Sequence, residues 1–167
     1  MAKKAKKIKL KSHKGTQKVL NVRDIGGWKV SKSNKYINQN LIYRCGRLHS
    51  GSNIEITNEG IQAFQELGIK TEIDLRYSGE NSIRSESVIP NVSFKSCPLD
   101  FHFDYLSAEI NQASIRSVFE IFADKTNYPV IFHCSIGTDR TGLIAFLLNG
   151  LLGVEVDDLV RGHLALS

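Results

Sequence analysis

Residues 129–142 read Pro-Val-Ile-Phe-His-Cys-Ser-Ile-Gly-Thr-Asp-Arg-Thr-Gly. The apolar run that opens this stretch is typical of a strand covered on both faces of a sheet. From Thr141 to about Leu152 the side chains are apolar nearly all round, which predicts a buried helix. A loop between such a strand and such a helix points backbone N–H groups and the positive helix end at one spot. The stretch therefore predicts an anion-binding loop.

The rest of the chain alternates predicted strands with predicted helices. Strands are expected at residues 41–44, 71–76 and 92–97, where apolar and polar residues alternate or run together. A helix should begin after the N-cap candidate Thr57 and end at Gly68. Further helices are expected over residues 107–125 and 156–165. This alternation predicts an α/β fold with a mostly parallel central sheet flanked by helices.

The loop itself carries reactive chemistry. Cys134 begins it and Arg140 ends it, so the backbone between them can form a cradle about the size of a phosphate group. Gly137 allows a backbone conformation that a β-carbon would hinder. The planar guanidinium of Arg140 matches two phosphate oxygens, and the same positive field favours the nucleophilic thiolate of Cys134. The alternative is a buried, inert cysteine beside a helix-capping loop.

Residues 133–142 resemble the signature HCxxGxxR[ST]G of the cysteine-based protein tyrosine phosphatases. Three upstream blocks, at residues 21–27, 41–48 and 71–76 with Glu80, are similar to motifs of a bacterial branch of tyrosine and phosphoinositide phosphatases. The resemblance covers residues from about 20 to 167. It implies a cysteine-phosphatase fold and a phosphomonoester hydrolase that needs neither metal nor cofactor. Its substrate would be a phosphorylated protein, with phosphotyrosine the first candidate, or another phosphomonoester.

The resemblance also implies roles for the loop residues. Cys134 would attack phosphorus and form a cysteinyl-phosphate intermediate. Arg140 would hold the phosphate oxygens, Thr141 would hydrogen-bond the cysteine sulfur, and His133 would support the loop backbone. The phosphate-binding residues expected on this basis are Ser135, Ile136, Gly137, Thr138, Asp139 and Arg140.

The general acid has three candidates. In the bacterial branch the aspartate beside the arginine is favoured, and it corresponds to Asp139. Other tyrosine phosphatases use an aspartate roughly thirty residues upstream, which points to Asp104 or Asp100. Two residues depart from the usual loop of the branch: Thr138 replaces a lysine, which weakens the expectation of a phosphoinositide substrate, and Ile136 replaces a small alanine.

Several other polar residues have two interpretations. Four charged residues could contact the loop from behind, although buried ion pairs or turn contacts are the commoner role for such groups: Arg23, Asp24, Asp74 and Arg76. Cys45 and Cys97 are most simply small apolar residues, with a protective disulfide to Cys134 under oxidation as the alternative. The five histidines show no ligand spacing, so no metal site is expected.

Composition separates a basic tail from the rest. Eight lysines and no acid precede Val19, so the net charge of +5 leaves about −3 for the remainder. We expect residues 1–18 to be a disordered tail and residues 19–167 to be the phosphatase domain. A shortening of this domain at its C-terminus is left open. No apolar run reaches membrane-spanning length, and no groove-reading motif indicates nucleic-acid binding. No hydrophobic segment of a secretory signal follows the basic start. The cytoplasm is therefore the expected compartment, with a secreted or periplasmic protein that has lost its leader as the alternative.

The sequence leaves a second function class open. The chain could be a catalytically weak module that recognises phosphorylated partners through the same loop. Cys134, Asp139 and Arg140 favour the enzyme, whereas the early end at Ser167 favours the binding module. A sulfur- or arsenate-handling enzyme does not account for the Arg140-Thr-Gly142 ending.

Overall fold

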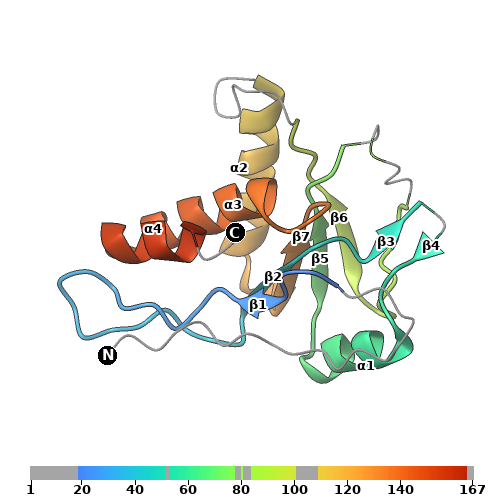
Figure 1. Cartoon of the computed structure of the whole chain (residues 1–167), viewed down its shortest axis with the longest axis horizontal. Coiled ribbons are helices and arrows are strands. Elements are labelled where there is room, and N and C mark those ends of the chain that lie inside the picture. Colours follow the sequence, from blue (N-terminus) through green and yellow to red (C-terminus); the bar gives the residue numbers. More distant parts are fainter. Residues whose placement is uncertain (1–18, 52, 78–79, 81–83, 101–108, 165–167) are drawn as a thin grey trace.

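The computed structural model describes residues 19–51, 53–77, 80, 84–100 and 109–164. Within these ranges the central sheet has five strands in the order β1-β2-β7-β5-β6 (Figure 1). Strands β2, β7, β5 and β6 run parallel, and only the edge strand β1 is antiparallel to its neighbour. This confirms the predicted mostly parallel sheet. The strands are β1 (Arg23–Asp24), β2 (Ile42–Cys45), β5 (Thr71–Asp74), β6 (Ser93–Ser96) and β7 (Val130–His133).

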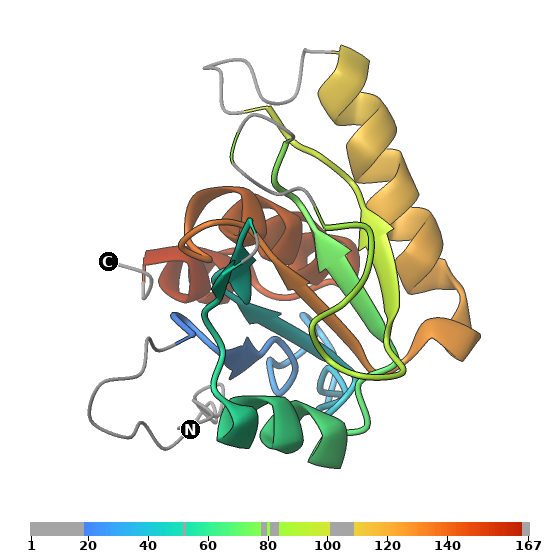
Figure 2. The ribbon, with the colours of Figure 1, turned by 90° about the vertical axis from the view of Figure 1, so that its right-hand side faces the viewer.

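Helices cover both faces of the sheet (Figure 2). Helix α2 (Glu109–Ala123) and helix α3 (Asp139–Leu151) share one apolar cluster with the strands, in which Val118 and Ile144 contribute from the two helices. Helix α1 (Asn58–Glu66) covers the opposite face, where Phe64 belongs to a second cluster. Helix α4 (Val156–Leu164) packs against α3. The remaining elements are a hairpin, β3 (His49–Ser50) and β4 (Asn53–Ile54), and the short 3-10 helix Lys125–Asn127.

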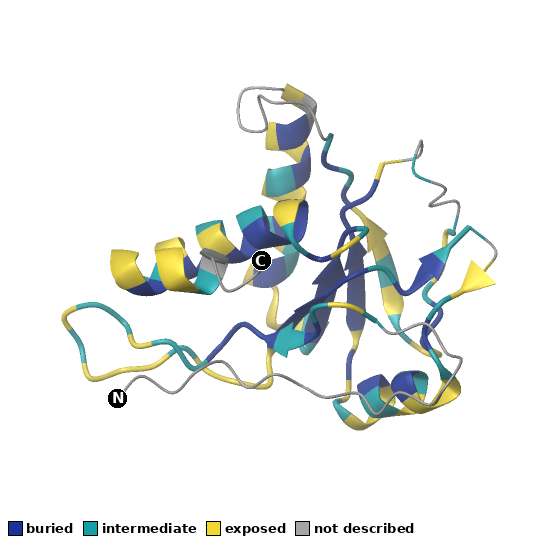
Figure 3. Ribbon diagram, viewed as in Figure 1, coloured by how far each residue is buried: buried dark blue, intermediate teal, exposed yellow. Residues whose placement is uncertain are grey.

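The middle strand β7 is buried along its whole length (Figure 3). Val130, Ile131 and Phe132 have no exposed surface, and their side chains divide between the two clusters. A strand covered on both faces is what its uninterrupted apolar sequence predicted. Because β7 lies between β2 and β5, its carboxyl end delivers Cys134 to the centre of the sheet edge.

The local signals of α1 are confirmed. The side chain of Thr57 accepts a hydrogen bond from the backbone N–H of Gly60 at 3.0 Å, as an N-cap residue should. Gly68 follows the helix with φ +68°, the left-handed conformation that commonly ends helices. The predicted helices over 107–125 and 156–165 are also present, although residues 107, 108 and 165 lie outside the described part.

Two predictions about α3 are wrong. The helix begins at Asp139, two residues before Thr141, so Asp139 and Arg140 lie in its first turn. It is also not buried all round, since Phe146 is 40% and Leu151 73% exposed. Only one side of α3 packs on the sheet, and the partner α4 covers a further part of its surface without enclosing it. Strand β1 (Arg23–Asp24) is a third difference, because it is not among the strands predicted from the sequence.

Candidate active site

The loop between β7 and α3 places the two expected functional ends together. Cys134 is 3% exposed at the end of the strand, and Arg140 is 1% exposed in the first helical turn. We call residues 134–140 the cradle. Its backbone turns back on itself, so that the Gly137 N–H lies 3.3 Å from the sulfur of Cys134 and donates a hydrogen bond to it. Strand, loop and helix N-terminus thus converge on the thiol, which is the arrangement of an anion site.

Gly137 is required by the shape of the cradle. Its φ of +81° is in the left-handed region. A β-carbon at this position would lie 2.6 Å from the carbonyl carbon and oxygen of Cys45, and 2.7 Å from the nitrogen of Gly46. The cradle therefore rests directly on the end of β2, and only glycine permits that approach.

The surroundings of Cys134 favour its thiolate. Burial raises the pKa of this thiol, but hydrogen bonds from the hydroxyl and amide of Thr141, the Gly137 amide and the charge of Arg140 outweigh it. The net result is a pKa lowered from the ordinary value of 9.0. By contrast, burial raises the pKa of Cys97 to about 11, and that of Cys45 is also raised, chiefly by burial. Of the three cysteines, only Cys134 has a lowered pKa, so it is the candidate nucleophile.

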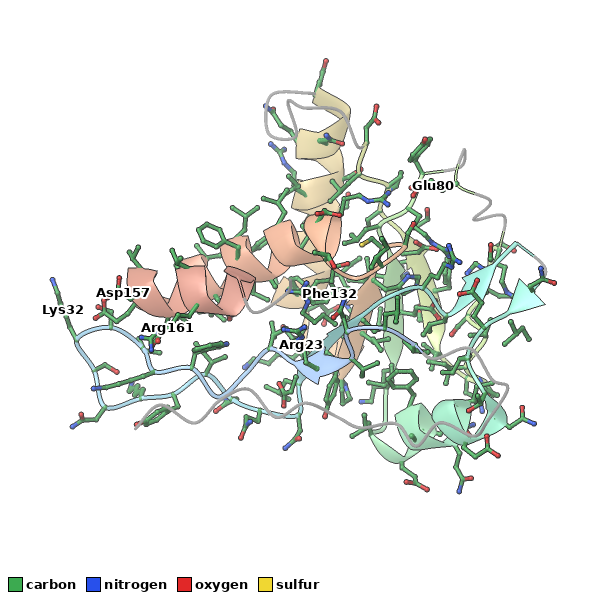
Figure 4. The ribbon with its side chains drawn as sticks, viewed as in Figure 1. Arg23, Lys32, Glu80, Phe132, Asp157 and Arg161 are labelled. Carbon is green, nitrogen blue, oxygen red and sulfur yellow. The ribbon has the colours of Figure 1, made fainter. Side chains whose placement is uncertain are left out.

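Glu80 fixes the guanidinium of Arg140. The carboxylate, labelled in Figure 4, comes from the segment after β5 and accepts from both terminal nitrogens of Arg140, with 2.7 Å from Nη2 to Oε1. The hydroxyl of Ser135 donates to the same carboxylate at 2.8 Å. Burial raises the pKa of Glu80, but the hydrogen bonds from Arg140 and Ser135 and the Arg140 charge lower it overall. The carboxylate stays charged and holds the arginine fork in one orientation.

A buried ionic network supports the strand end beneath the cradle. His133 Nε2 lies 2.9 Å from Glu72 Oε1, and His133 Nδ1 lies 3.8 Å from Asp74. Asp74 is in turn paired with Arg76, with 2.7 Å between Oδ2 and Nη2. Burial lowers the pKa of His133, but the charges of Asp74 and Glu72 and the Glu72 hydrogen bond raise it overall. His133 therefore lies in a supporting position rather than at the reacting centre.

For the charged residues that had two possible roles, the observed contacts are the structural ones. Asp74 and Arg76 form the buried ion pair just described. Asp24 accepts from the backbone N–H groups of Gly26 at 2.8 Å and Asn40 at 2.7 Å, which are turn contacts. Arg23 donates to the side chain of Asn21 at 3.2 Å. Cys45 and Cys97 are both buried in the apolar clusters, as their simple interpretation expects.

Sequence analysis missed three residues that contact the site. Arg44 donates to the carbonyl of Gly137 at 2.6 Å, and Asn21 donates to the carbonyl of Ile136 at 2.9 Å. Glu72 is the fully buried partner of His133. Asn21 and Arg44 belong to upstream blocks that resemble family motifs, so the signal was present without a role attached to it. For Glu72, a carboxylate in an otherwise strand-like segment was the available signal.

The structure describes two of the three candidate general acids, Asp139 and Asp100. Asp139 is an exposed residue at the start of α3, next to Arg140 in the sequence. Asp100 follows Leu99, whose carbonyl oxygen lies 3.4 Å from Arg140 Nη1, so Asp100 also adjoins the site. Asp104 lies outside the described residues. Of the two unusual loop residues, Ile136 is 55% exposed, and Thr138 accepts a hydrogen bond from Asn21 at 3.3 Å.

Neither a metal site nor a membrane span is found in the residues that the structure describes. No three His, Cys, Asp or Glu side chains are arranged there to hold a metal ion. The described helices are all too short or too polar to cross a bilayer.

Comparison with known proteins finds a matching family model and two curated relatives. The tyrosine phosphatase family model matches residues 15–165. A protein of Cupriavidus necator, named as a tyrosine-protein phosphatase, is 26% identical over 174 residues, covering 87% of this chain and 60% of the relative. A tyrosine-protein phosphatase of Nostoc commune is 27% identical over 137 residues, covering 65% of this chain and 44% of the relative. The chain thus spans less than two thirds of the length of these relatives.

Solved structures share the fold. The catalytic core of the PP-IP phosphatase SIW14 from S. cerevisiae superposes with a TM-score of 0.55 at 15% identity, covering 76% of this chain and 75% of that one. P. aeruginosa TpbA in complex with phosphotyrosine superposes with a TM-score of 0.52 at 20% identity, covering 81% of this chain and 76% of that one. At these identities the likeness concerns architecture, and it agrees with the predicted cysteine-phosphatase fold.

Proposed function

The chain belongs to the tyrosine phosphatase family, and on that premise we propose that it hydrolyses phosphomonoesters through a cysteinyl-phosphate intermediate, without a metal ion. The observation that carries this proposal is the buried Cys134 thiol, whose pKa is lowered inside a cradle closed by Arg140. A thiolate beside a guanidinium and converging amides is suited to nucleophilic attack on a phosphate dianion.

The first step transfers the phosphoryl group to the protein. Cys134 Sγ forms a bond to phosphorus as the bond from phosphorus to the substrate oxygen breaks. The cradle amides and Arg140 stabilise the charge that develops on the equatorial oxygens. A general acid gives its proton to the departing oxygen.

The second step releases inorganic phosphate. A water molecule attacks phosphorus, the sulfur–phosphorus bond breaks, and the carboxylate that gave its proton takes one from the water. The hydroxyl of Thr141, which acts to lower the pKa of Cys134, stabilises the departing thiolate. Ser135 contributes through Glu80, whose carboxylate orients Arg140 in both steps.

We assign the proton transfers to Asp139, because it adjoins Arg140 in the first turn of α3. Asp100 and Asp104 are the competing assignments. Changing the true general acid to asparagine slows the hydrolysis of aryl phosphates with poor leaving groups far more than the hydrolysis of those with good ones. The reason is that only a poor leaving group needs the proton. Comparing phenyl phosphate with para-nitrophenyl phosphate in Asp139→Asn, Asp100→Asn and Asp104→Asn therefore identifies the acid.

The preferred substrate in this proposal is phosphotyrosine. With only 3% of Cys134 exposed, the nucleophile lies at the base of the site, and a long aryl phosphate reaches it more readily than a short alkyl phosphate. The related fold of TpbA in complex with phosphotyrosine supports the same choice. Parallel assays with phosphotyrosine and phosphoserine peptides test it: equal turnover of the two contradicts the preference.

The decisive experiment is hydrolysis of para-nitrophenyl phosphate in EDTA by the protein and its Cys134→Ser variant. We expect activity that survives EDTA and is lost in the variant, together with a trapped phospho-cysteine on rapid acid quench. Loss of activity in EDTA contradicts the metal-free mechanism. If the intact protein binds vanadate yet shows no turnover, the catalytic proposal fails and the phosphate-binding module replaces it.

A further inference from the structure

We propose that Asn21 and Arg44 are positioning residues that hold the empty cradle in its phosphate-binding conformation by binding its outward-facing carbonyl oxygens. The inference rests on the proposed function for its catalytic consequence. It concerns oxyanion binding in the first place, so it can be tested on a protein that turns over no substrate.

All four carbonyl oxygens in the middle of the cradle are bound from outside. Ser135 accepts from the Arg47 N–H at 3.1 Å, and Thr138 accepts from the Gly142 N–H at 2.7 Å. The two between them bind side chains: Ile136 accepts from Asn21 Nδ2 at 2.9 Å and Gly137 from Arg44 Nη2 at 2.6 Å. The carbonyl of Ser135 thus depends on a backbone donor, and that of Thr138 on a backbone donor with a longer contact from Arg44 Nη2 at 3.4 Å, whereas the two between them depend on side chains from the β1–β2 region.

Outward carbonyls imply inward amides. In a planar trans peptide the C=O and the following N–H point in opposite directions. Binding the carbonyls of residues 135–138 outside therefore turns the N–H groups of residues 136–139 toward the interior of the cradle. One of them is seen directly, since the Gly137 N–H donates to Cys134 Sγ at 3.3 Å. These amides are the donors that the proposed chemistry needs.

The cradle needs such support when no phosphate is bound. Several N–H dipoles pointing at one spot repel one another, and a peptide can relieve this by rotating its N–H outward. A bound oxyanion prevents the rotation. In its absence the rotation is opposed by the outer contacts and, for the Gly137 amide, by the hydrogen bond to Cys134 Sγ. The side chains of Asn21 and Arg44 hold the two peptides farthest from either end of the loop, where the strand and the helix exert least control.

The orientation of Asn21 is itself fixed. Its Oδ1 accepts from Arg23 Nη2 at 3.2 Å, which directs Nδ2 toward Ile136 and Thr138. Its backbone φ of +54° brings the side chain to this place from a turn before β1. Arg23 and Arg44 are register partners on β1 and β2, so Arg23 lies beside Arg44 and acts on the cradle only through Asn21.

The charge of Arg44 adds to its hydrogen bond. Arg44 is 4% exposed, and among the described residues no carboxylate forms an ion pair with it. Burial and the charge of Arg23 lower the pKa of Arg44 to about 10, while Cys134 and Cys45 act to raise it, so the guanidinium remains a cation at neutral pH. Its positive charge favours a thiolate and a bound dianion in the adjacent cradle.

The test measures tungstate, an oxyanion that needs no turnover, by titration calorimetry. Asn21→Gly removes the donor but keeps the positive φ accessible, and Asn91→Gly is its matched control at another positive-φ asparagine, with φ +61° on an exposed turn. Arg44→Met removes the guanidinium. Its control is Arg161→Met on α4, which lies far from Glu80 in Figure 4. Melting temperatures show that each variant is folded.

We expect tungstate affinity to fall about 10-fold in Asn21→Gly and 10- to 100-fold in Arg44→Met. For comparison, outright removal of an oxyanion-hole donor lowers kcat by about 10²- to 10³-fold. Both controls should bind as the unaltered chain does. Arg44→Lys should recover part of the loss. If Asn21→Gly is folded and binds tungstate within 2-fold of its control, the inference is wrong, and this holds even if Arg44→Met fails to fold. If the unaltered chain does not bind tungstate at all, the inference is also wrong. Binding without hydrolysis would instead count against the proposed function alone.

Discussion

Replacement of Gly137 by alanine tests how strictly the cradle depends on its contact with β2. The new β-carbon would lie 2.6 Å from backbone atoms of Cys45, whereas ordinary contact begins at 3.4 Å. Because the obstructing atoms belong to the backbone of a buried strand, no side chain can rotate away. The cradle itself must therefore move by about 0.8 Å, and this displacement disturbs the hydrogen bond from the Gly137 amide to Cys134, which is 3.3 Å long.

The displacement sets the expected size of the effect. A misplacement of about 1 Å among reacting groups costs about 100-fold in rate. We expect kcat/KM of Gly137→Ala to fall by about that factor. The left-handed backbone adds a stability cost of about 1–2 kcal/mol, because alanine disfavours a positive φ.

Gly68→Ala is the matched control. Its φ of +68° imposes a similar backbone strain, but nothing lies within 4 Å of the added β-carbon, and the residue follows α1, away from the cradle. We expect a melting temperature lower by about 2–8 °C from 1–2 kcal/mol of strain, with unchanged kcat/KM. The assays are para-nitrophenyl phosphate hydrolysis and thermal melting. If Gly137→Ala keeps kcat/KM within 3-fold of Gly68→Ala, the reasoning about close approach is refuted.

Three further predictions follow from the contacts around the site. Glu80→Gln should lower kcat/KM about 10-fold, because one charge-assisted contact on Arg140 is worth about 1.5 kcal/mol. The control Glu55→Gln, which disrupts the ion pair with Arg47 at 2.8 Å, should leave kcat/KM unchanged. Equal effects in both variants would contradict the role of Glu80. Thr141→Val should raise the pKa of the Cys134 thiol toward 9.0, which the pH dependence of iodoacetamide alkylation reports, and an unchanged midpoint would exclude the hydroxyl as a cause. His133→Gln should lower the free energy of unfolding by about 3 kcal/mol near pH 6, because it removes the charged partner of the buried Glu72 carboxylate, while Asp74 keeps its ion pair with Arg76. Since the folded-state pKa of His133 is raised above 6.5, this stabilisation is complete below pH 6.5 and is lost as the pH rises through the folded-state value. Denaturant unfolding near pH 9 should therefore show a smaller difference, and an equal or larger one would show that the His133 charge is not responsible.

The exposed side of α3 differs from what the sequence pattern predicted. Leu143, Phe146, Leu147 and Leu151 gave the helix an apolar surface on every side, and the pattern alone predicted complete burial. An apolar pattern shows which side chains are unfavourable in water, but it does not show whether enough other protein packs against them to bury them. In the described chain α4 covers only part of α3, so Leu151 remains 73% exposed.

The sequence by itself determined what local chemistry controls. The apolar run of β7, the cap at Thr57, the stop at Gly68 and the order of strands and helices follow from periodicity and from backbone preferences within a few residues. The loop from Cys134 to Arg140 could also be identified, because an anion cradle needs a nucleophile, a glycine and a guanidinium at short fixed separations. Its resemblance to a known signature then indicated the family.

Only the tertiary structure decided which distant groups hold that loop in place. Glu80 binds Arg140 across 60 residues of sequence, Arg44 binds the Gly137 carbonyl across 93, and Asn21 binds Ile136 across 115. No local pattern specifies these pairs, because each depends on the order in which β1, β2, β7 and β5 lie in the sheet. Parallel strands bring their carboxyl ends to one edge, and the side chains that meet there are set by register rather than by spacing along the chain.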